Sequence, residues 1–249
     1  MATHFKGPIL YSSARKGLEN LNTGMWPDQC TAWDDFVVEL DTAWTVVKDT
    51  GAAVAIAADT ANGVLTLTSA ATTDDDGASV QGNEIFQLPA EQAQMLWFEA
   101  RYYVDSTGGG SGASEMDTFI GLTENFVTNP ENGLDRANRI GFQMSDGSAV
   151  LQTVVSQTGP LANTFSLPAA NNVVDGEYQT VGFTLTKGAT TNGTNVAKFY
   201  VNRQLVNTET TFITTDLMAL AAVSLSGDAT GTKSMGVDYI LGSVDRVVY

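Results

Sequence analysis

Two pairs of carboxylates have the spacing that would place both members of a pair on one face of a β-strand. They are Glu39 with Asp41 and Glu115 with Asp117, and residues two apart along a strand point to the same side. Two carboxyl groups that flank a glycosidic bond can hydrolyse it, one as acid and the other as nucleophile or base. These pairs are therefore the first candidates for catalytic chemistry.

Histidine and cysteine chemistry has little material in this chain. His4 is the only histidine and Cys30 the only cysteine, so an intrachain disulfide and a zinc site made of cysteines are excluded. A Ser-His-Asp or Cys-His nucleophile would have to recruit His4, which lies in the N-terminal segment. A tyrosine such as Tyr102 or Tyr103 could act as an acid or base, but nothing beyond its presence supports this.

One compact acidic turn is a candidate for metal binding. Asp74, Asp75 and Asp76 precede Gly77, and Ca²⁺ prefers several such oxygens. The turn lacks the alternating aspartates and the distal glutamate of a calcium loop, so we interpret it as a solvated turn and predict no metal or other cofactor. A long polar segment with three asparagines could contribute to a sugar site, but their spacing matches no known motif: Asn125, Asn129 and Asn132.

The composition is that of a folded and strongly acidic protein. The 249 residues are 43% hydrophobic and carry a net charge of -16, which should repel phosphate backbones and predicts no nucleic-acid partner. No apolar run is long enough to cross a bilayer. The first residues lack the basic-then-apolar layout of a signal peptide, so we expect a protein made in a cytoplasm that has no membrane partner.

Most of the chain alternates apolar and polar residues in short segments that Gly, Asn and Asp separate, which is typical of antiparallel strands in a sandwich. In the segment 95–104, one face should carry Leu96, Phe98, Ala100 and Tyr102. We expect Trp44 and Trp97, which lie inside strand patterns, to be core residues, and Trp26 to pack at the sandwich edge or at a subunit contact. The predicted strands are 36–40, 44–47, 53–57, 64–68, 85–88, 95–104, 117–123, 139–144, 149–155, 177–187, 196–206 with a tight turn at Asn202-Arg203, 220–225 and 235–241.

The N-terminal segment differs from the rest in charge and pattern. Residues 1–20 contain three cations against Glu19 alone, a net charge of +2, which leaves -18 for the remainder. The segment has large apolar residues but no sustained alternation, so we predict an extended, docked arm. We divide the chain into an arm with its lead-in at 1–33 and one β-sandwich at 34–249.

Five segments, in their order, resemble the concanavalin A-like lectin and glucanase jelly-roll superfamily: 140–142, 146–147, 178–183, 196–202 and 237–240. This resemblance covers roughly residues 34–249 and implies two antiparallel sheets in a jelly roll. Glycoside hydrolases of the superfamily use Glu-x-Asp-x-Glu or Glu-x-Asp-x-x-Glu. Neither pair here has its third carboxylate, because Ala43 and Trp44, and Phe119 and Ile120, occupy those positions. We therefore predict that the chain is not an enzyme.

An arm of this kind before an acidic, cysteine-poor jelly roll is similar to structural proteins of tailed bacteriophages. That resemblance implies a decoration or cement protein, made in the host cytoplasm and placed on the capsid exterior of the virion. The arm would bind the major capsid protein by adding backbone hydrogen bonds to strand edges, and a homo-oligomer, with a trimer favoured, would engage several arms at once. The predicted capsid-binding residues are Phe5, Lys6, Pro8, Ile9, Leu10, Tyr11, Arg15 and Lys16.

Three other functions remain open from the sequence. The first is a carbohydrate-binding, lectin-like module on a phage tail or fibre, and a decoration protein could also bind glycans weakly. The second is a glycanase or lyase, which the missing carboxylates and the scarcity of histidine disfavour. The third is a β-sandwich whose role its sequence does not reveal.

Overall fold

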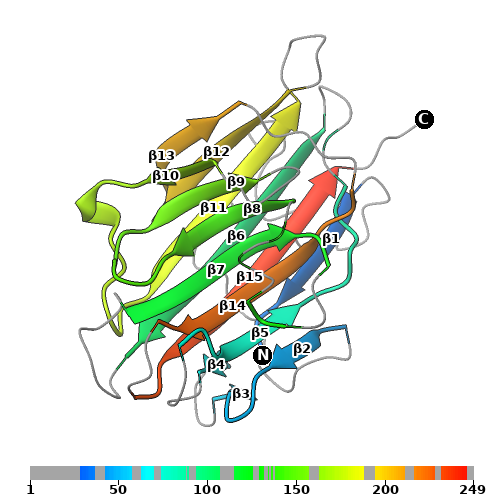
Figure 1. Cartoon of the computed structure of the whole chain (residues 1–249). Helices are drawn as coiled ribbons and strands as arrows, with labels where there is room; N and C mark the ends of the chain where they lie inside the picture. The colour runs from blue at the N-terminus through cyan, green and yellow to red at the C-terminus, as the bar shows by residue number, and fades with distance from the viewer. Residues whose placement is uncertain are drawn as a thin grey trace.

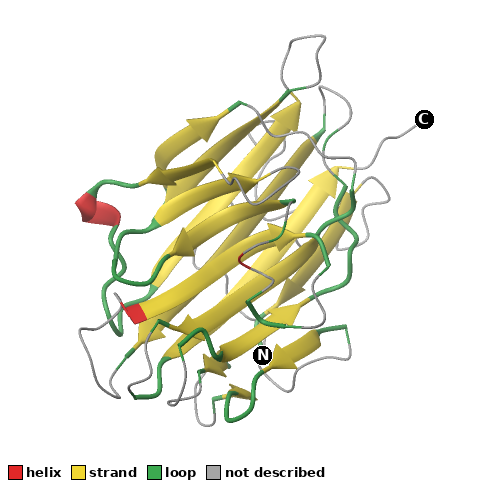
Figure 2. Cartoon of the chain, in the orientation of Figure 1, coloured by secondary structure: helices red, strands yellow, loops and turns green. Residues whose placement is uncertain are grey.

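The chain folds into two antiparallel sheets that lie one behind the other (Figure 1). Strands make up nearly all of the regular structure (Figure 2), so the predicted all-β sandwich is confirmed. The computed structural model describes residues 29–36, 43–57, 63–69, 74–87, 89, 94–106, 115–125, 129–131, 134, 136, 138–156, 163–187, 194–210, 216–227 and 231–245.

The eight-stranded sheet has the order β13-β12-β11-β6-β15-β4-β3, and β1 pairs with β15 beside this path. Its three longest strands, β11, β6 and β15, are neighbours in the middle of the sheet. The bounds are β1 (Gln29–Asp34), β3 (Ala53–Ile56), β4 (Leu65–Thr68), β6 (Met95–Asp105), β11 (Gln179–Lys187), β12 (Asn195–Val201), β13 (Gln204–Glu209) and β15 (Ser234–Asp245).

The seven-stranded sheet has the order β10-β9-β8-β7-β14-β5-β2. Strands β7, β8, β9 and β10 follow one another in sequence as neighbours, whereas β14 inserts beside β7 from late in the chain. The bounds are β2 (Thr45–Lys48), β5 (Gly77–Gln81), β7 (Met116–Thr123), β8 (Arg139–Met144), β9 (Gln152–Ser156), β10 (Asn163–Ser166) and β14 (Ala219–Ser226).

Alternation along β6 divides the inside of the sandwich from its outside. The residues of one face, which have at most 1% of their surface exposed, point at the other sheet, as predicted: Leu96, Phe98, Ala100 and Tyr102. The residues of the other face are only half-buried and lie on the outside: Trp97, Glu99, Arg101 and Tyr103. The expectation that Trp97 is a core residue is therefore wrong, because its position in the alternation places it on the outer face.

Aromatic rings join the two sheets in the core. Phe142 of β8 meets Phe199 of β12 edge to face, with ring centroids 5.5 Å apart. Phe183 of β11 stacks on Phe98 of β6 at 5.0 Å. Buried aromatic pairs add specific contacts to the hydrophobic burial that holds a sandwich together. Trp44 packs against this core while only partly buried, and its indole nitrogen donates to Asp34 Oδ2 at 2.8 Å.

The strand predictions differ from the structure in particular places. Segment 85–88 supplies only a single bridge, between Phe86 and Met218, and β1, β5 and β10 were not predicted. Most of segment 36–40 lies outside the described residues. β1 spans positions 33 and 34, where we placed the boundary between lead-in and sandwich, and the two-part division itself stays a prediction.

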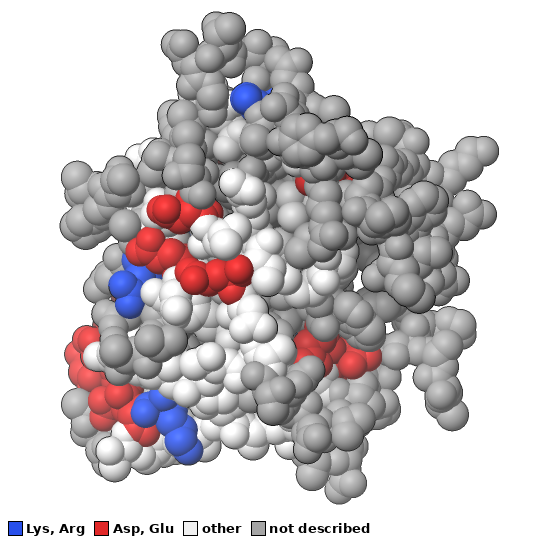
Figure 3. Space-filling model, turned by 90° about the vertical axis from the view of Figure 1, so that its right-hand side faces the viewer, with Lys and Arg blue, Asp and Glu red and all other residues white. Residues whose placement is uncertain are grey.

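Acidic side chains form several separate groups on the face in Figure 3, and basic side chains appear at few places on it. No helix within the described part of the chain is long and apolar enough to cross a membrane. The arm residues predicted to bind a capsid, Trp26 and the pair Glu39 and Asp41 all lie outside the described residues.

Candidate functional site

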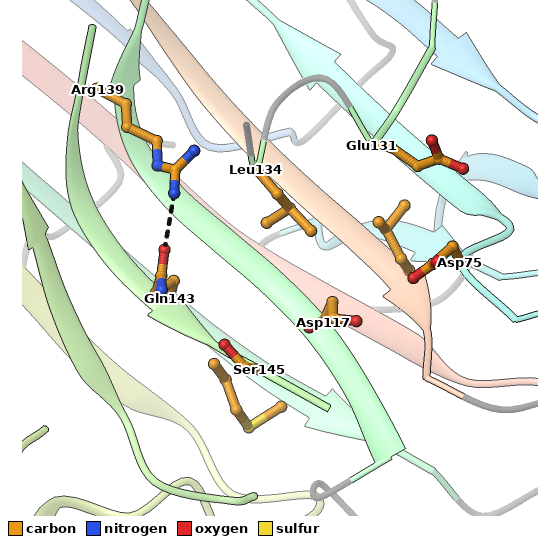
Figure 4. A pocket seen from close by; sticks show the side chains of 9 residues that line it. Asp75, Asp117, Glu131, Leu134, Arg139, Gln143 and Ser145 are labelled. Atoms are coloured by element: carbon orange, nitrogen blue, oxygen red, sulfur yellow. Dashed lines mark hydrogen bonds between the residues drawn. The ribbon is translucent and has the colours of Figure 1, made fainter. Parts of the chain in front are cut away.

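A cleft of about 300 Å³ opens on the outer face of the seven-stranded sheet (Figure 4). Strand register explains why polar residues from separate strands meet there. Asp117 of β7 lies opposite Leu225 of β14, and the β7–β8 pairing places Gln143 beside Phe119. We call this the Asp117 cleft, and it is lined by Asp75, Asp117, Glu131, Leu134, Arg139, Gln143, Met144, Ser145 and Leu225.

Strand β8 presents a row of three residues along this face, Arg139, Gly141 and Gln143, at alternate positions. Arg139 and Gln143 are 6% and 9% exposed. The Arg139 guanidinium donates to Gln143 Oε1 at 3.4 Å, and Gln143 Nε2 donates to Gln152 Oε1 of β9 at 3.0 Å (Figure 4 shows the first bond). The two side chains are therefore held in a fixed orientation at the edge of the cleft.

Asp117 is the titratable group of the cleft. Burial raises the pKa of its carboxyl to about 6, and the negative charges of Asp146, Asp75 and Asp74 act in the same direction. The backbone N–H of Asp146, which donates to Asp117 Oδ1 at 2.8 Å, opposes the rise. A carboxyl group with this pKa exchanges its proton near neutral pH, so it can accept or donate a hydrogen bond and can act as an acid or base.

An apolar cluster fills the part of this outer face that lies beside the cleft. Phe119, Val154, Ala221, Val223 and Leu225 are at most 1% exposed and form the apolar cluster, against which Leu134 packs. Phe119 occupies the position of the third carboxylate in a Glu-x-Asp-x-Glu pattern that begins at Glu115. A hydrolase of that type therefore has no acid at this point of the face.

Two glycines bring β7 and β8 close together beside the apolar cluster. Gly121 and Gly141 are direct cross-strand partners. A Cβ atom on Gly121 would lie 2.3 Å from the carbonyl oxygen of Ile140, and one on Gly141 would lie 2.4 Å from that of Ile120. Only glycine fits where two backbones approach this closely, so this part of the face is bare backbone.

A second, acidic cleft of about 520 Å³ lies where β7 ends, and Glu84, Glu124, Asn125, Asp216 and Leu217 line it. Asn138 links two of its acids, since Nδ2 donates to Glu124 Oε2 at 2.9 Å and to Asp216 Oδ2 at 2.7 Å. Within the described residues, no three His, Cys, Asp or Glu side chains form a group that could hold a metal ion. The carboxylates of the acidic cleft and those of the candidate turn Asp74–Asp76 are among the side chains that form no such group.

The structure separates most of the residues that the sequence nominated. Glu115 does not join Asp117 in the cleft, because it lies 3.7 Å from the ammonium group of the fully buried Lys233. Tyr102 is a core residue whose pKa burial raises far above its ordinary value, whereas Tyr103 lies on the outer face of the other sheet. Asn125 lines the acidic cleft, Asn129 bonds to Glu131, and Asn132 lies outside the described residues.

Sequence reasoning found Asp117 but missed Arg139, Gln143 and Ser145. The prediction of a strand at 139–144 contained the signal, because alternate positions of that strand hold an arginine, a glycine and an amide. It could not show which of the two faces would lie beside Asp117, since that depends on strand pairing.

No protein-family model matches the chain, and no curated protein matches its sequence. Solved structures show the fold. The chain is similar to an endo-1,3-beta-glucanase from Streptomyces sioyaensis with a TM-score of 0.62 at 15% identity, covering 89% of this chain and 98% of that one. An endo-beta-1,4-glucuronan lyase from Trichoderma reesei gives 0.60 at 14% identity, covering 87% and 95%. The carbohydrate recognition domain of Emp47p gives 0.58 at 10%, covering 88% and 98%.

These structures confirm the concanavalin A-like jelly roll. They overturn the prediction that the chain is not an enzyme, because glucanases and lyases share this fold over nearly their whole length. That prediction rested on the absence of one carboxylate motif and on the scarcity of histidine. The absence of one motif does not exclude an enzyme that uses other side chains. In this chain, Asp117 is a titratable group on the outer face of the seven-stranded sheet.

Proposed function

We propose that this protein is a carbohydrate-recognising jelly roll carried on the outside of a phage particle. The observation that supports recognition is the Asp117 cleft, in which a carboxyl group, a fixed amide and a hydroxyl converge on one sheet face. The phage context is supported by the sequence of the arm and by the acidic, cysteine-poor body. Each half of the proposal has its own test.

The lining of the cleft suits the hydroxyl groups of a sugar. An ionised Asp117 can accept hydrogen bonds from two neighbouring hydroxyls, and the amide of Gln143 can both donate and accept. Ser145 adds a hydroxyl that can do either. A cleft of about 300 Å³ is at the small end of ligand sites. We therefore expect it to hold a short stretch of a glycan and not a long chain.

Calorimetry with short oligosaccharides from laminarin and from alginate tests the cleft. We expect one class to bind, and Gln143→Ala to weaken that binding about fivefold, because a lost hydrogen bond corresponds to about 1 kcal/mol. Glu84→Gln, in the acidic cleft, is the matched control and should bind as the parent does. Equal affinities for all three proteins, or no binding of either oligosaccharide class, would refute the cleft as a sugar site.

The same mixtures also test for turnover. Hydrolysis of the polysaccharides would release new reducing ends, and a lyase would release unsaturated ends that absorb ultraviolet light. Asp117→Asn should abolish any such activity if Asp117 is the acid or base, because the amide cannot exchange a proton. Activity that persists in this variant would assign the chemistry to another group.

The phage half of the proposal assigns a decoration role. The arm at residues 1–20 would bind the major capsid protein, and the acidic jelly roll, in a trimer, would face solvent on the capsid exterior. Deleting residues 1–20 should abolish binding to capsids while circular dichroism shows an unchanged sandwich. Retained capsid binding would refute the arm model, and location on a tail or fibre would favour the lectin-like alternative.

A further inference from the structure

Tyr178 lies on the outer face of the eight-stranded sheet and is 40% exposed. Two neighbours hold its ring. The ring of Tyr103 on β6 meets it edge to face at 4.9 Å between centroids. The guanidinium carbon of Arg101, also on β6, lies 3.9 Å from the Tyr178 centroid, a distance at which the cation is attracted to the ring. An exposed aromatic ring is thus fixed in one orientation.

The two residues that hold Tyr178 are themselves fixed. Arg101 forms an ion pair with Asp238 of β15. The ring of Tyr103 fills the space above Gly236, where a Cβ atom would come within 2.2 Å of Tyr103 Cε1. Both supports are therefore set by cross-strand contacts, and the ring of Tyr178 loses little freedom when a ligand stacks on it.

A hydrogen-bonded pair continues this surface toward the β12–β13 turn. The hydroxyl of Tyr239 donates to Glu99 Oε1 at 2.6 Å. Burial raises the pKa of Glu99, and the positive charge of Arg203 opposes that rise. Arg203 lies in the tight turn with φ at +71°, a conformation in which glycine is the least strained residue. Its neighbour Asn202 exchanges hydrogen bonds with Thr180 at 2.7 and 3.1 Å, so the turn lies beside the start of β11, next to Tyr178, and the exposed side chain of Arg203 adds positive charge there.

We propose that these residues form a second carbohydrate-binding surface, centred on Tyr178 and separate from the Asp117 cleft on the other sheet. A sugar ring would stack its C–H face on the side of the Tyr178 ring opposite Arg101, and Arg203 would bond to hydroxyl or carboxylate oxygens of the same polymer. Neither of the two clefts includes these residues. The ligand class is therefore an extended polysaccharide bound on an open sheet face, and not a small molecule held in a cleft.

Native affinity electrophoresis in gels that contain laminarin, a neutral glucan, or alginate, a uronate polymer, tests this surface. We expect one polymer to retard the protein and Tyr178→Ala to weaken that retardation about tenfold, the factor that about 1.4 kcal/mol corresponds to. Phe165→Ala is the matched control, since Phe165 is 45% exposed on β10 of the other sheet. Retardation by alginate alone would assign the surface to acidic polymers.

Arg203→Gly separates a binding role from a structural one. Glycine relieves the strain of the left-handed turn, so the thermal midpoint should rise while the polymer affinity falls. The surface is refuted if neither polymer retards the protein, if Tyr178→Ala and Phe165→Ala behave alike, or if Arg203→Gly binds as the parent does. The gels compare these variants in a Gln143→Ala background, and Tyr178→Ala alone should leave the calorimetric affinity of the cleft for short oligosaccharides unchanged, so failure of the Asp117 cleft and failure of this surface are distinguishable.

Discussion

The outer faces of the two sheets differ in how their side chains are buried or exposed. On the seven-stranded sheet, the centre of the face is an apolar cluster at most 1% exposed, and the Asp117 cleft opens beside it. On the eight-stranded sheet, tyrosines, arginines and carboxylates satisfy one another across the strands and remain partly exposed. The apolar side chains at the centre of the first face are buried, whereas the second face carries paired polar groups that remain partly exposed. We therefore expect the second face to be the one that offers an extended surface to a ligand.

The largest expected effect is a loss of stability from a substitution on the outer face of the seven-stranded sheet. Gly121→Val should reduce the free energy of unfolding by about 3 kcal/mol or more, because its Cβ would overlap the backbone of β8. Chemical denaturation measures the change. Gly82→Ala is the control on the same sheet, where the nearest atom to a new Cβ is 3.7 Å away, and it should cost less than about 1 kcal/mol. Equal losses would mean that the close approach of the two strands does not matter.

One aromatic residue from each face sharpens the contrast. Phe119→Ala should lower the free energy of unfolding by about 3–5 kcal/mol, since it removes a fully buried ring. Tyr178→Ala should lower it by only about 1 kcal/mol, because the ring is 40% exposed and loses one aromatic and one cationic contact. If urea unfolding shows that both variants lose a similar free energy of unfolding, the two faces do not differ in the way that we describe.

A smaller effect tests the polar pairing itself. Tyr239→Phe removes the hydrogen bond to Glu99 and should cost about 1–2 kcal/mol in the free energy of unfolding, because the partner is a partly buried carboxylate. Thermal unfolding of the two proteins measures this. A variant as stable as the parent would show that the hydrogen bond between Tyr239 and Glu99 adds nothing to the stability of the fold. The contacts of Tyr178 would then be the remaining evidence for polar pairing on this face.

The smallest effect is the pH dependence of stability that Asp117 causes on the outer face of the seven-stranded sheet. The pKa of Asp117 is raised from 3.8 to about 6, so between these values the folded state binds more protons and stability rises as the pH falls. Asp117→Asn removes the buried charge. It should raise the free energy of unfolding at pH 7 by about 1 kcal/mol, allowing for solvent screening of a partly exposed group, with the gain lost near pH 4. A gain that is equal at both pH values would contradict the assigned cause.

How far the sequence predicts this molecule depends on the element. Strand β6 was predictable because Leu96, Phe98, Ala100 and Tyr102 recur at every second position, although the apolar Trp97 between them hid which face it belongs to. β5 was missed because all five of its residues are buried, so Gly, Ser and Gln replace the expected polar face and no alternation is visible. β10 was missed for the opposite reason, since all four of its residues are exposed and no apolar face marks it.

The candidate sites were harder to predict than the strands. Asp117 stood out as part of a carboxylate pair, but its partner Glu115 lies near Lys233 instead. The Asp117 cleft combines residues from β7, β8 and β14, and the pairing of β7 with β14 joins positions as far apart in the sequence as Asp117 and Leu225. Strand periodicity shows which residues share a face of one strand. It does not show which strands are neighbours.

Cryo-electron microscopy of the particle that carries this protein tests the central claim most directly. We expect density for the jelly roll on the capsid exterior, with residues 1–20 across neighbouring subunits and the outer face of the eight-stranded sheet, around Tyr178, turned to solvent where a polysaccharide can reach it. Density in which that face is buried against the capsid, or a particle that lacks the protein on its exterior, would contradict the account.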